Sequence, residues 1–340
     1  MKPLYEVLPD GRWKMYFDHH KIFTFSTCER LFNFKHIQNQ RRKGGEVFAA
    51  AIGIWWSSVM EEVYERMSLG EEPTETSVCT IAAKKWQSSN MKRLETTCPD
   101  KYMKFALGPD IQTYGVPPGP LAMALDYYNH RLGNDFRNYK VVAVETTFGV
   151  HSDLIIGEND KVVVCFQGRP DLAILDNHDR LMPIDFKTKD YPDPASLIME
   201  YKPHPQTAGY VFALNKISQE MFTDRVVDRC VLVVCGRMTP RTPRNKEKAN
   251  PRFVEVNVDY SRSEIEEWRM QTLAKATRLR YAIEHNEFIM KDISCHYQFG
   301  KPCEFREVCR KPPEVRDFII STDYETMVPW DPGKPERRNK

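Results

Sequence analysis

The sequence has no apolar run long enough to cross a membrane, and its first residues, MKPLYEVLPDGRWK, lack the apolar core of a signal peptide. It also has no internal repeat and no low-complexity tract, which excludes solenoid and fibrous architectures. The net charge is only +2 over 340 residues, so a surface for nucleic acid would have to come from local clusters of basic side chains. We therefore expect a cytoplasmic protein without a membrane segment.

The sequence also lacks the cysteine pattern of a disulfide-stabilised protein. Its nine cysteines are an odd number, and a reducing compartment keeps thiols free. Five cysteines are scattered along the chain. Two of them, Cys165 and Cys230, lie in strand-like apolar runs, where a thiol acts as a small hydrophobic group. Three others lie in the polar stretch SCHYQFGKPCEFREVC, separated by seven and then five residues: Cys295, Cys303 and Cys309. This spacing is typical of metal ligands.

The hydrophobic content of 41% and the charged content of 28% are those of an ordinary globular protein. Apolar residues at helical spacing predict helices over 23–37, 46–67, 74–95, 121–132, 204–217 and 261–285, with Thr74, Thr76 and Ser77 as candidate caps. Runs of β-branched residues predict strands over 141–148, 161–166, 230–235 and 253–258. We expect residues 1–20 to be irregular and the proline-rich stretch 96–120 to form a loop.

These elements predict an α/β fold in which helices flank a central mixed β-sheet of five or six strands. Three regions are expected within one integrated domain. They are a helical N-terminal region at 1–135 that carries Cys28, a core at 136–290, and a cysteine-bearing segment with the tail at 291–340.

The stretch GRPDLAILDNHDRLMPIDFKTK at 168–189 carries the clearest chemical signal. Two short apolar runs flank the polar residues 176–180, which is the pattern of a β-hairpin. Because strand side chains alternate between faces, Asp185 and Lys187 share one face, and the hairpin sets Asp171 opposite them. Two carboxylates form a hard oxygen site suited to Mg²⁺ or Mn²⁺, and a lysine beside them can orient water or neutralise charge. The alternative from this stretch alone, with equal weight, is a surface hairpin with an ordinary salt bridge.

Further motifs carry a resemblance to a known family. The segments GRPD (168–171), IDFKT (184–188) and QTAGY (206–210) resemble, in order and spacing, the PD-(D/E)XK nuclease superfamily. More narrowly, they resemble the branch that contains the RecB nuclease domain, the AddB C-terminal nuclease and the CRISPR-associated Cas4 exonucleases. The segment STCERLFNF around Cys28 is similar to the N-terminal iron–sulfur cysteine segment of that branch. The resemblance spans roughly residues 23 to 310 and implies a restriction-endonuclease-like core.

The resemblance also implies roles for individual residues. Asp171 and Asp185 would bind the catalytic Mg²⁺ or Mn²⁺, and Lys187 would position the attacking water. Gln206 and Tyr210 lie one helical turn apart, so they would brace the site and contact the DNA strand. By themselves these two residues would be interpreted as an incidental polar pair on an amphipathic helix. Together with the hairpin they favour an active site.

One departure from the family lies in the predicted helix at 46–67. The family reads Gly-x-x-x-His-x-x-x-Glu there, whereas this sequence has Gly53, Ser57 and Glu61. The resemblance keeps Glu61 as a catalytic candidate, but serine replaces a metal-binding histidine, which should weaken a preference for Mn²⁺ more than binding of Mg²⁺. Glu145 resembles a glutamate that the family often carries on the strand before the first aspartate. The missing histidine leaves room for a nuclease of low activity.

The cysteines depart from the family as well, because its C-terminal trio usually has two residues in the first gap. Cys28, Cys295, Cys303 and Cys309 are still enough for the [4Fe–4S] cluster that the resemblance implies, or for a structural Zn²⁺ with His296 as a spare ligand. Such a cluster would link the two ends of the chain, and its loss should loosen the fold. The alternative is a set of unligated thiols.

Local charge supplies the candidate contacts with DNA. The segment 236–252 holds six basic residues against one glutamate, Glu247, and could bind the phosphates of a single strand or a duplex end. A solvated loop without a partner is the equal alternative. The arginines expected to contact nucleic acid are Arg169, Arg237, Arg241 and Arg244.

The sequence thus predicts a metal-dependent deoxyribonuclease of the exonuclease-like branch, of prokaryotic or phage origin. A helicase, or a recombination or CRISPR protein, would be a partner suggested by the resemblance; the oligomeric state is left open. An alternative from another class is a catalytically weak DNA-binding protein on the same fold, suggested by Ser57. A restriction-type endonuclease is disfavoured, because the cysteines and the Gln-x-x-x-Tyr helix belong to the exonuclease-like branch.

Overall fold

The computed structural model describes residues 4–43, 48–89, 96, 98, 100, 102, 118–145, 153–155, 162–190, 192–220, 225–237, 252–291, 293, 295 and 302–328. The chain divides into two compact units. The first contains Met1–Gly44, Thr147–Gly168 and Ser261–Lys340, and the second contains Gly45–Thr146 and Arg169–Tyr260. Each unit is therefore assembled from segments that are far apart in the sequence.

The second unit is built on a five-stranded sheet in the order β10-β9-β8-β7-β4. Its strands are β4 (Lys140–Val144), β7 (Leu172–Leu175), β8 (Leu181–Lys189), β9 (Arg229–Gly236) and β10 (Phe253–Asp259). Only β8 and β9 pair in parallel, so the sheet is mixed, as predicted. The predicted hairpin is confirmed: β7 and β8 are antiparallel, with Leu172 opposite Ile184.

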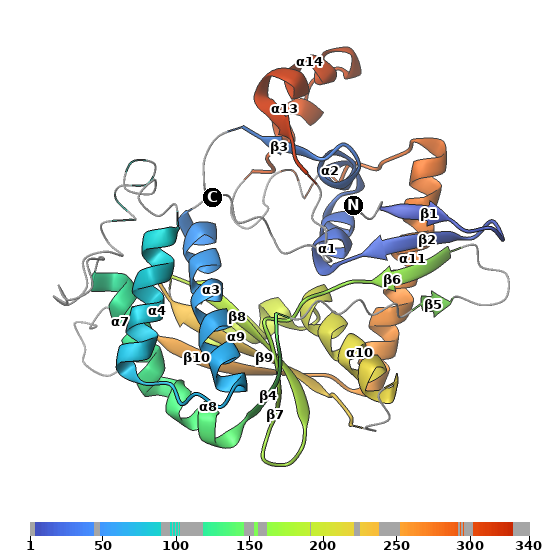
Figure 1. The fold of residues 1–340 in the computed structure, drawn as a ribbon. Helices are drawn as coiled ribbons and strands as arrows, with labels where there is room; N and C mark the ends of the chain where they lie inside the picture. Colours follow the sequence, from blue (N-terminus) through green and yellow to red (C-terminus); the bar gives the residue numbers. More distant parts are fainter. Residues whose placement is uncertain are drawn as a thin grey trace. The chain divides into compact units, whose positions relative to one another are not determined.

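Helices lie against both faces of this sheet (Figure 1). One group consists of α3 (Phe48–Ser68), α4 (Glu75–Ser88), α7 (Pro118–Tyr127), η3 (Tyr128–Leu132) and α8 (Gly133–Asn138). Their core includes Trp55 and Trp56 and takes Ile184 and Phe186 from β8. The other group consists of α9 (Pro194–Tyr201) and α10 (Pro205–Glu220), and α10 packs on β8 and β9. Because strand side chains alternate, the face of β8 opposite Ile184 and Phe186 carries Asp185 and Lys187.

The ends of these helices follow from local chemistry. Thr74 begins α4 as expected, since its hydroxyl accepts the Ser77 N–H at 3.1 Å and the Ser77 hydroxyl accepts the Thr74 N–H. The short helix α9 was absent from the sequence prediction. Its signal was present, because Asp193 caps the first turn and Pro194 occupies the first helical position.

The first unit contains a four-stranded sheet in the order β1-β2-β6-β5. Its strands are β1 (Tyr5–Val7), β2 (Trp13–Phe17), β5 (Asp153–Ile155) and β6 (Val162–Phe166). The expectation that residues 1–20 are irregular is wrong, since they contain two strands and the start of a helix. Part of the signal was local, because Asp10 and Gly11 form the turn of the β1–β2 hairpin. The parallel pairing of β2 with β6 is non-local, and residues 1–20 do not indicate it.

The helices of the first unit are α1 (His19–Thr27), α2 (Glu29–Phe32), η1 (Asn33–Ile37), α11 (Arg262–His285), α13 (Arg306–Cys309) and α14 (Pro313–Asp323). Within this unit, β3 (Gln40–Arg42), which follows η1, pairs antiparallel with β11 (Tyr324–Thr326), which lies near the end of the described residues. The helix predicted over 23–37 is interrupted at Cys28, where the backbone is extended. Among the helices that the structure describes, none is both long and apolar enough to span a membrane.

Candidate active site

The β7–β8 hairpin brings Asp171, Asp185 and Lys187 together. Asp185 is only 1% exposed, and the Lys187 Nζ atom lies 2.5 Å from its Oδ2 atom. The Asp171 carboxylate precedes β7 and accepts the Phe186 N–H at 2.7 Å. That bond joins Asp171 to the backbone between the other two residues. The register of the hairpin, which the sequence predicts, is therefore what assembles the three side chains.

Helix α10 supplies two further groups to the same place. The Gln206 side-chain amide donates to Asp185 Oδ1 at 2.8 Å and to the Tyr210 hydroxyl at 3.2 Å. The Tyr210 hydroxyl in turn donates to the Arg169 carbonyl at 2.9 Å. Both side chains are buried. The chain of bonds runs from Asp185 through Gln206 and Tyr210 to the backbone just before Asp171, so it fixes the two aspartates relative to each other.

Burial and like charge dominate the electrostatics of the pair. Burial raises the pKa of Asp171, and the neighbouring Asp185 carboxylate raises it further. Burial alone would lower the pKa of Lys187, but the adjacent Asp185 carboxylate outweighs it and the pKa rises. Lys187 is therefore a permanent cation at neutral pH. Two carboxylates held this close in a dry site would be stabilised by additional positive charge.

The raised pKa of Asp171 predicts a pH dependence of stability. A carboxyl whose pKa is higher in the folded chain binds more protons there than in the unfolded chain, so the free energy of unfolding falls as pH rises through that interval. In EDTA, we expect the melting temperature to fall as pH rises from about 4, the ordinary carboxyl value, towards the raised pKa. Asp171→Asn should flatten this fall, whereas Asp179→Asn, in the exposed turn of the hairpin, should not. Equal slopes in the two variants would contradict the assignment.

Glu145 lies directly after β4 and belongs to the same neighbourhood. Its Oε1 atom accepts the Ser57 hydroxyl at 3.1 Å, and its Oε2 atom lies 3.3 Å from the Arg169 guanidinium. The serine that stands in place of the family's histidine thus contacts a carboxylate. Glu61 lies one turn beyond Ser57 on α3 and is half-buried.

The donor set fits a hard divalent cation. The Asp185 Oδ2 atom is buried and accepts no hydrogen bond from a described residue, although it pairs with Lys187. Mg²⁺ and Mn²⁺ take one or two carboxylates and complete their coordination with water and phosphate oxygens. Within the described residues, no three His, Cys, Asp or Glu side chains form a ready-made metal cage. Asp171 and Asp185 would therefore hold a cation that shares its remaining positions with solvent and substrate.

Tyr201 is a buried residue near the site that the sequence did not suggest. It ends α9, is 8% exposed, and its carbonyl accepts the hydroxyls of Thr207 at 2.8 Å and Tyr260 at 3.2 Å. Burial raises its pKa to about 12, while the Lys187 ammonium lowers it and the Asp185 carboxylate raises it. The phenol therefore lies within electrostatic range of both groups. The sequence signals the helix α9 through Asp193 and Pro194, but it contains no signal for the position of the Tyr201 side chain.

The four candidate cysteines all belong to the first unit. Cys28 is buried between α1 and α2, and Cys303 and Cys309 pack against the same cluster. Burial raises the pKa of Cys303 and raises that of Cys309 to about 11; the thiols of Cys28 and Cys295 contribute to both shifts. The four thiols thus share one neighbourhood. As placed, however, no three of these described cysteines are grouped closely enough to bind one metal ion.

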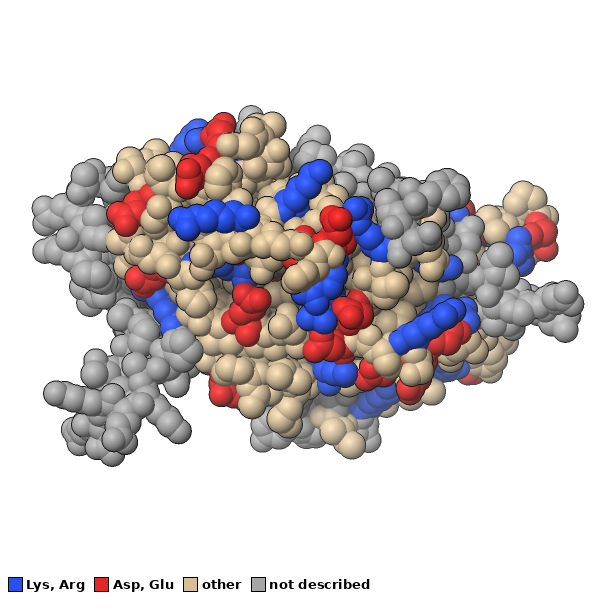
Figure 2. All heavy atoms as spheres, turned by 90° about the horizontal axis from the view of Figure 1, so that it is seen from below, with Lys and Arg blue, Asp and Glu red and all other residues tan. Residues whose placement is uncertain are grey.

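The structure describes two of the four arginines that are predicted to contact nucleic acid. Arg169 pairs with Glu145, and Arg237 donates from Nε to Asp190 at 2.9 Å and from Nη1 to the Thr188 carbonyl at 3.3 Å. Arg241 and Arg244, like most of the basic segment 236–252, lie outside the described residues, as does His296. Among the described residues that Figure 2 shows, basic and acidic side chains are interspersed.

A mixed sheet carries two aspartates and a lysine on a hairpin, braced by a glutamine from α10, which is the arrangement expected of a nuclease in this α/β class. The chain belongs to the PD-(D/E)XK nuclease superfamily, whose family model matches residues 19–310. Membership implies a nucleic-acid substrate, and nucleases of this superfamily typically use a divalent metal. A comparison with curated proteins finds no match.

Proposed function

We propose that the protein is a metal-dependent deoxyribonuclease of the exonuclease-like branch represented by RecB, AddB and Cas4. The observation that carries the proposal is the hydrogen bond from Gln206 to Asp185, continued through Tyr210 to the Arg169 carbonyl. An ordinary surface salt bridge between Asp185 and Lys187 would not require a buried chain of hydrogen bonds to hold the Asp185 carboxylate. A buried polar chain that orients one carboxylate is instead typical of a site whose geometry matters.

The residues divide the chemistry among themselves. A divalent cation, when bound, would lower the pKa of a water molecule and stabilise the charge that develops on the phosphate. Asp171 and Asp185 would hold that cation, and the Lys187 ammonium would orient the attacking water and neutralise negative charge. Gln206 keeps Asp185 Oδ1 in place, so the carboxylate presents its other oxygen, Oδ2, to the site.

The test is hydrolysis of labelled DNA. Purified protein should degrade linear single-stranded or duplex DNA in Mg²⁺ or Mn²⁺ and not in EDTA. A covalently closed circle should resist, because an exonuclease needs an end. Fragments of defined length from the circle would instead indicate an endonuclease.

The second candidate is a catalytically weak protein that binds DNA on the same fold. It is favoured by Ser57, whose hydroxyl binds Glu145 and cannot replace an imidazole as a metal ligand. Binding of DNA without hydrolysis in Mg²⁺ and in Mn²⁺ would select this function.

The cysteines of the first unit belong to the same proposal. We propose that Cys28, Cys295, Cys303 and Cys309 bind a [4Fe–4S] cluster, with Zn²⁺ as the alternative. It is supported by the packing of Cys303 and Cys309 against the cluster that contains Cys28, and by the hydrogen bond from the Cys303 N–H to the Cys295 carbonyl at 3.3 Å. Anaerobically purified protein should be brown, absorb at about 400 nm and contain iron. The variant Cys303→Ser should lose that absorbance. A colourless protein with stoichiometric zinc would select the alternative, and a protein with neither would refute both.

A further inference from the structure

Glu145 is held through its backbone and through both of its carboxylate oxygens. Its N–H donates to the Asp171 carbonyl at 2.9 Å, its Oε1 atom accepts the Ser57 hydroxyl at 3.1 Å, and its Oε2 atom pairs with Arg169 at 3.3 Å. Its φ is +41°, in the left-handed region that a side chain with a Cβ rarely adopts. Such a conformation persists only where the surroundings impose it, and it clusters at functional sites. The position of this carboxylate is therefore a built feature of the site.

Glu145 also lies beside Asp171. Its backbone bonds to Asp171, and its charge is one of those that raise the pKa of that residue. Its side chain is 10% exposed, so little water separates it from its neighbours. Any positive charge that enters beside Asp171 would attract the Glu145 carboxylate as well.

Arg169 is the cation that pairs with the Glu145 carboxylate. Its carbonyl accepts the Tyr210 hydroxyl, and its side chain is 23% exposed, so part of the side chain is accessible to solvent. A guanidinium can bind a phosphate through two parallel hydrogen bonds. While Arg169 pairs with Glu145, part of that capacity is used within the protein.

We propose that Glu145 controls the availability of Arg169 for a DNA phosphate, an inference that rests on the proposed function. Without a divalent cation, Glu145 Oε2 stays on Arg169. A cation held by Asp171 and Asp185 would attract the Glu145 carboxylate, weaken its pairing with Arg169 and so make the guanidinium available to the phosphate. The Ser57 hydroxyl would stay bonded to Oε1. Cation and DNA then strengthen each other's binding through a single carboxylate.

The test measures DNA binding, not hydrolysis. The probe is a short fluorescein-labelled single strand, followed by anisotropy in EDTA and in Ca²⁺, at constant ionic strength. We expect the wild-type affinity to rise about tenfold in Ca²⁺, a size typical of coupling between sites. Glu145→Gln should bind in EDTA about as tightly as the wild type binds in Ca²⁺. Arg169→Ala should bind weakly in both buffers and lose the rise.

Arg169→Ala is the decisive variant, because a general effect of cation charge would leave its rise in affinity intact and overturn the proposal. If Arg169→Ala does not fold, as judged by circular dichroism, Arg169→Gln replaces it. The control is Glu200→Gln, which removes the carboxylate partner of Lys189 at the surface and should keep the wild-type rise. An unchanged Ca²⁺ dependence in Glu145→Gln would also overturn the proposal. If the wild type binds DNA more tightly in Ca²⁺ but does not hydrolyse DNA in Mg²⁺ or Mn²⁺, the result would count against the nuclease function alone.

Discussion

Lys187→Ala is expected to lower the rate of DNA hydrolysis by about 10³-fold, the size typical of removing a group that orients water or stabilises charge in the transition state. Its ammonium lies 2.5 Å from Asp185 Oδ2, at the oxygen that Gln206 leaves unoccupied. Asp185→Ala should have at least as large an effect, because it removes a ligand of the proposed cation. Rates measured with end-labelled DNA in Mg²⁺ and in Mn²⁺ give both values.

A matched control lies two residues further along the same strand. Lys189 is on the same face of β8, but it pairs with Glu200 on α9 and is 30% exposed. Lys189→Ala should keep the rate within about threefold of wild type, since exposed ion pairs contribute little. Circular dichroism should show that all variants are folded. Full activity in both Lys187→Ala and Asp185→Ala would refute the assignment of the active site.

Arg131→Ala is expected to lower the free energy of unfolding by about 3–5 kcal/mol, because it leaves a buried carboxylate without its cation. The Arg131 side chain is 5% exposed, donates from Nε to Asp135 at 2.7 Å and pairs with Glu255 on β10. Asp135 also accepts the Tyr64 hydroxyl, and the hydroxyls of Tyr64 and Tyr127 are 2.9 Å apart. Burial already raises the pKa of Asp135, so the network depends on this guanidinium.

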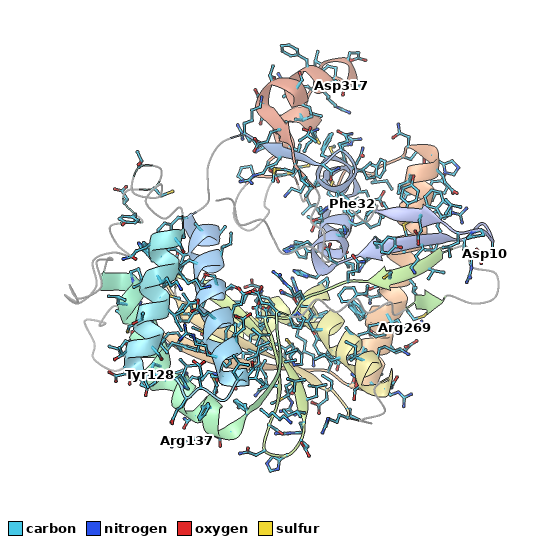
Figure 3. All side chains as sticks on the ribbon, viewed as in Figure 1. Asp10, Phe32, Tyr128, Arg137, Arg269 and Asp317 are labelled. Atoms are coloured by element: carbon cyan, nitrogen blue, oxygen red, sulfur yellow. The ribbon has the colours of Figure 1, made fainter. Side chains whose placement is uncertain are left out.

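The control for this prediction is Arg137→Ala on α8. Arg137 is exposed, and Figure 3 shows it at the rim of the helices that cover the sheet. Its removal should change the free energy of unfolding by less than about 0.5 kcal/mol, as is usual for surface positions. Urea unfolding followed by tryptophan fluorescence measures both variants. Equal stability of the two would show that the buried network contributes nothing.

Much of the fold follows from patterns within short segments. The apolar periodicity of α3 and α11, the capping residue Thr74, and the alternation of the β7–β8 hairpin all act between near neighbours in the chain. Part of what escaped prediction depends on contacts between distant segments. The strand β2 is stabilised by β6, and Trp13–Phe17 gives no sign of that partner. The short helix α9 was missed because its capping signal is brief.

The candidate site divides in the same way. The sequence by itself determined that Asp185 and Lys187 share one face of a strand and that Asp171 lies opposite, since the two-residue period and the turn decide both. Only the tertiary structure decided that Gln206 reaches Asp185, that Tyr201 lies near Lys187, and that Ser57 and Arg169 share one carboxylate, Glu145. These contacts join separate elements, and their geometry depends on how helices pack on the sheet.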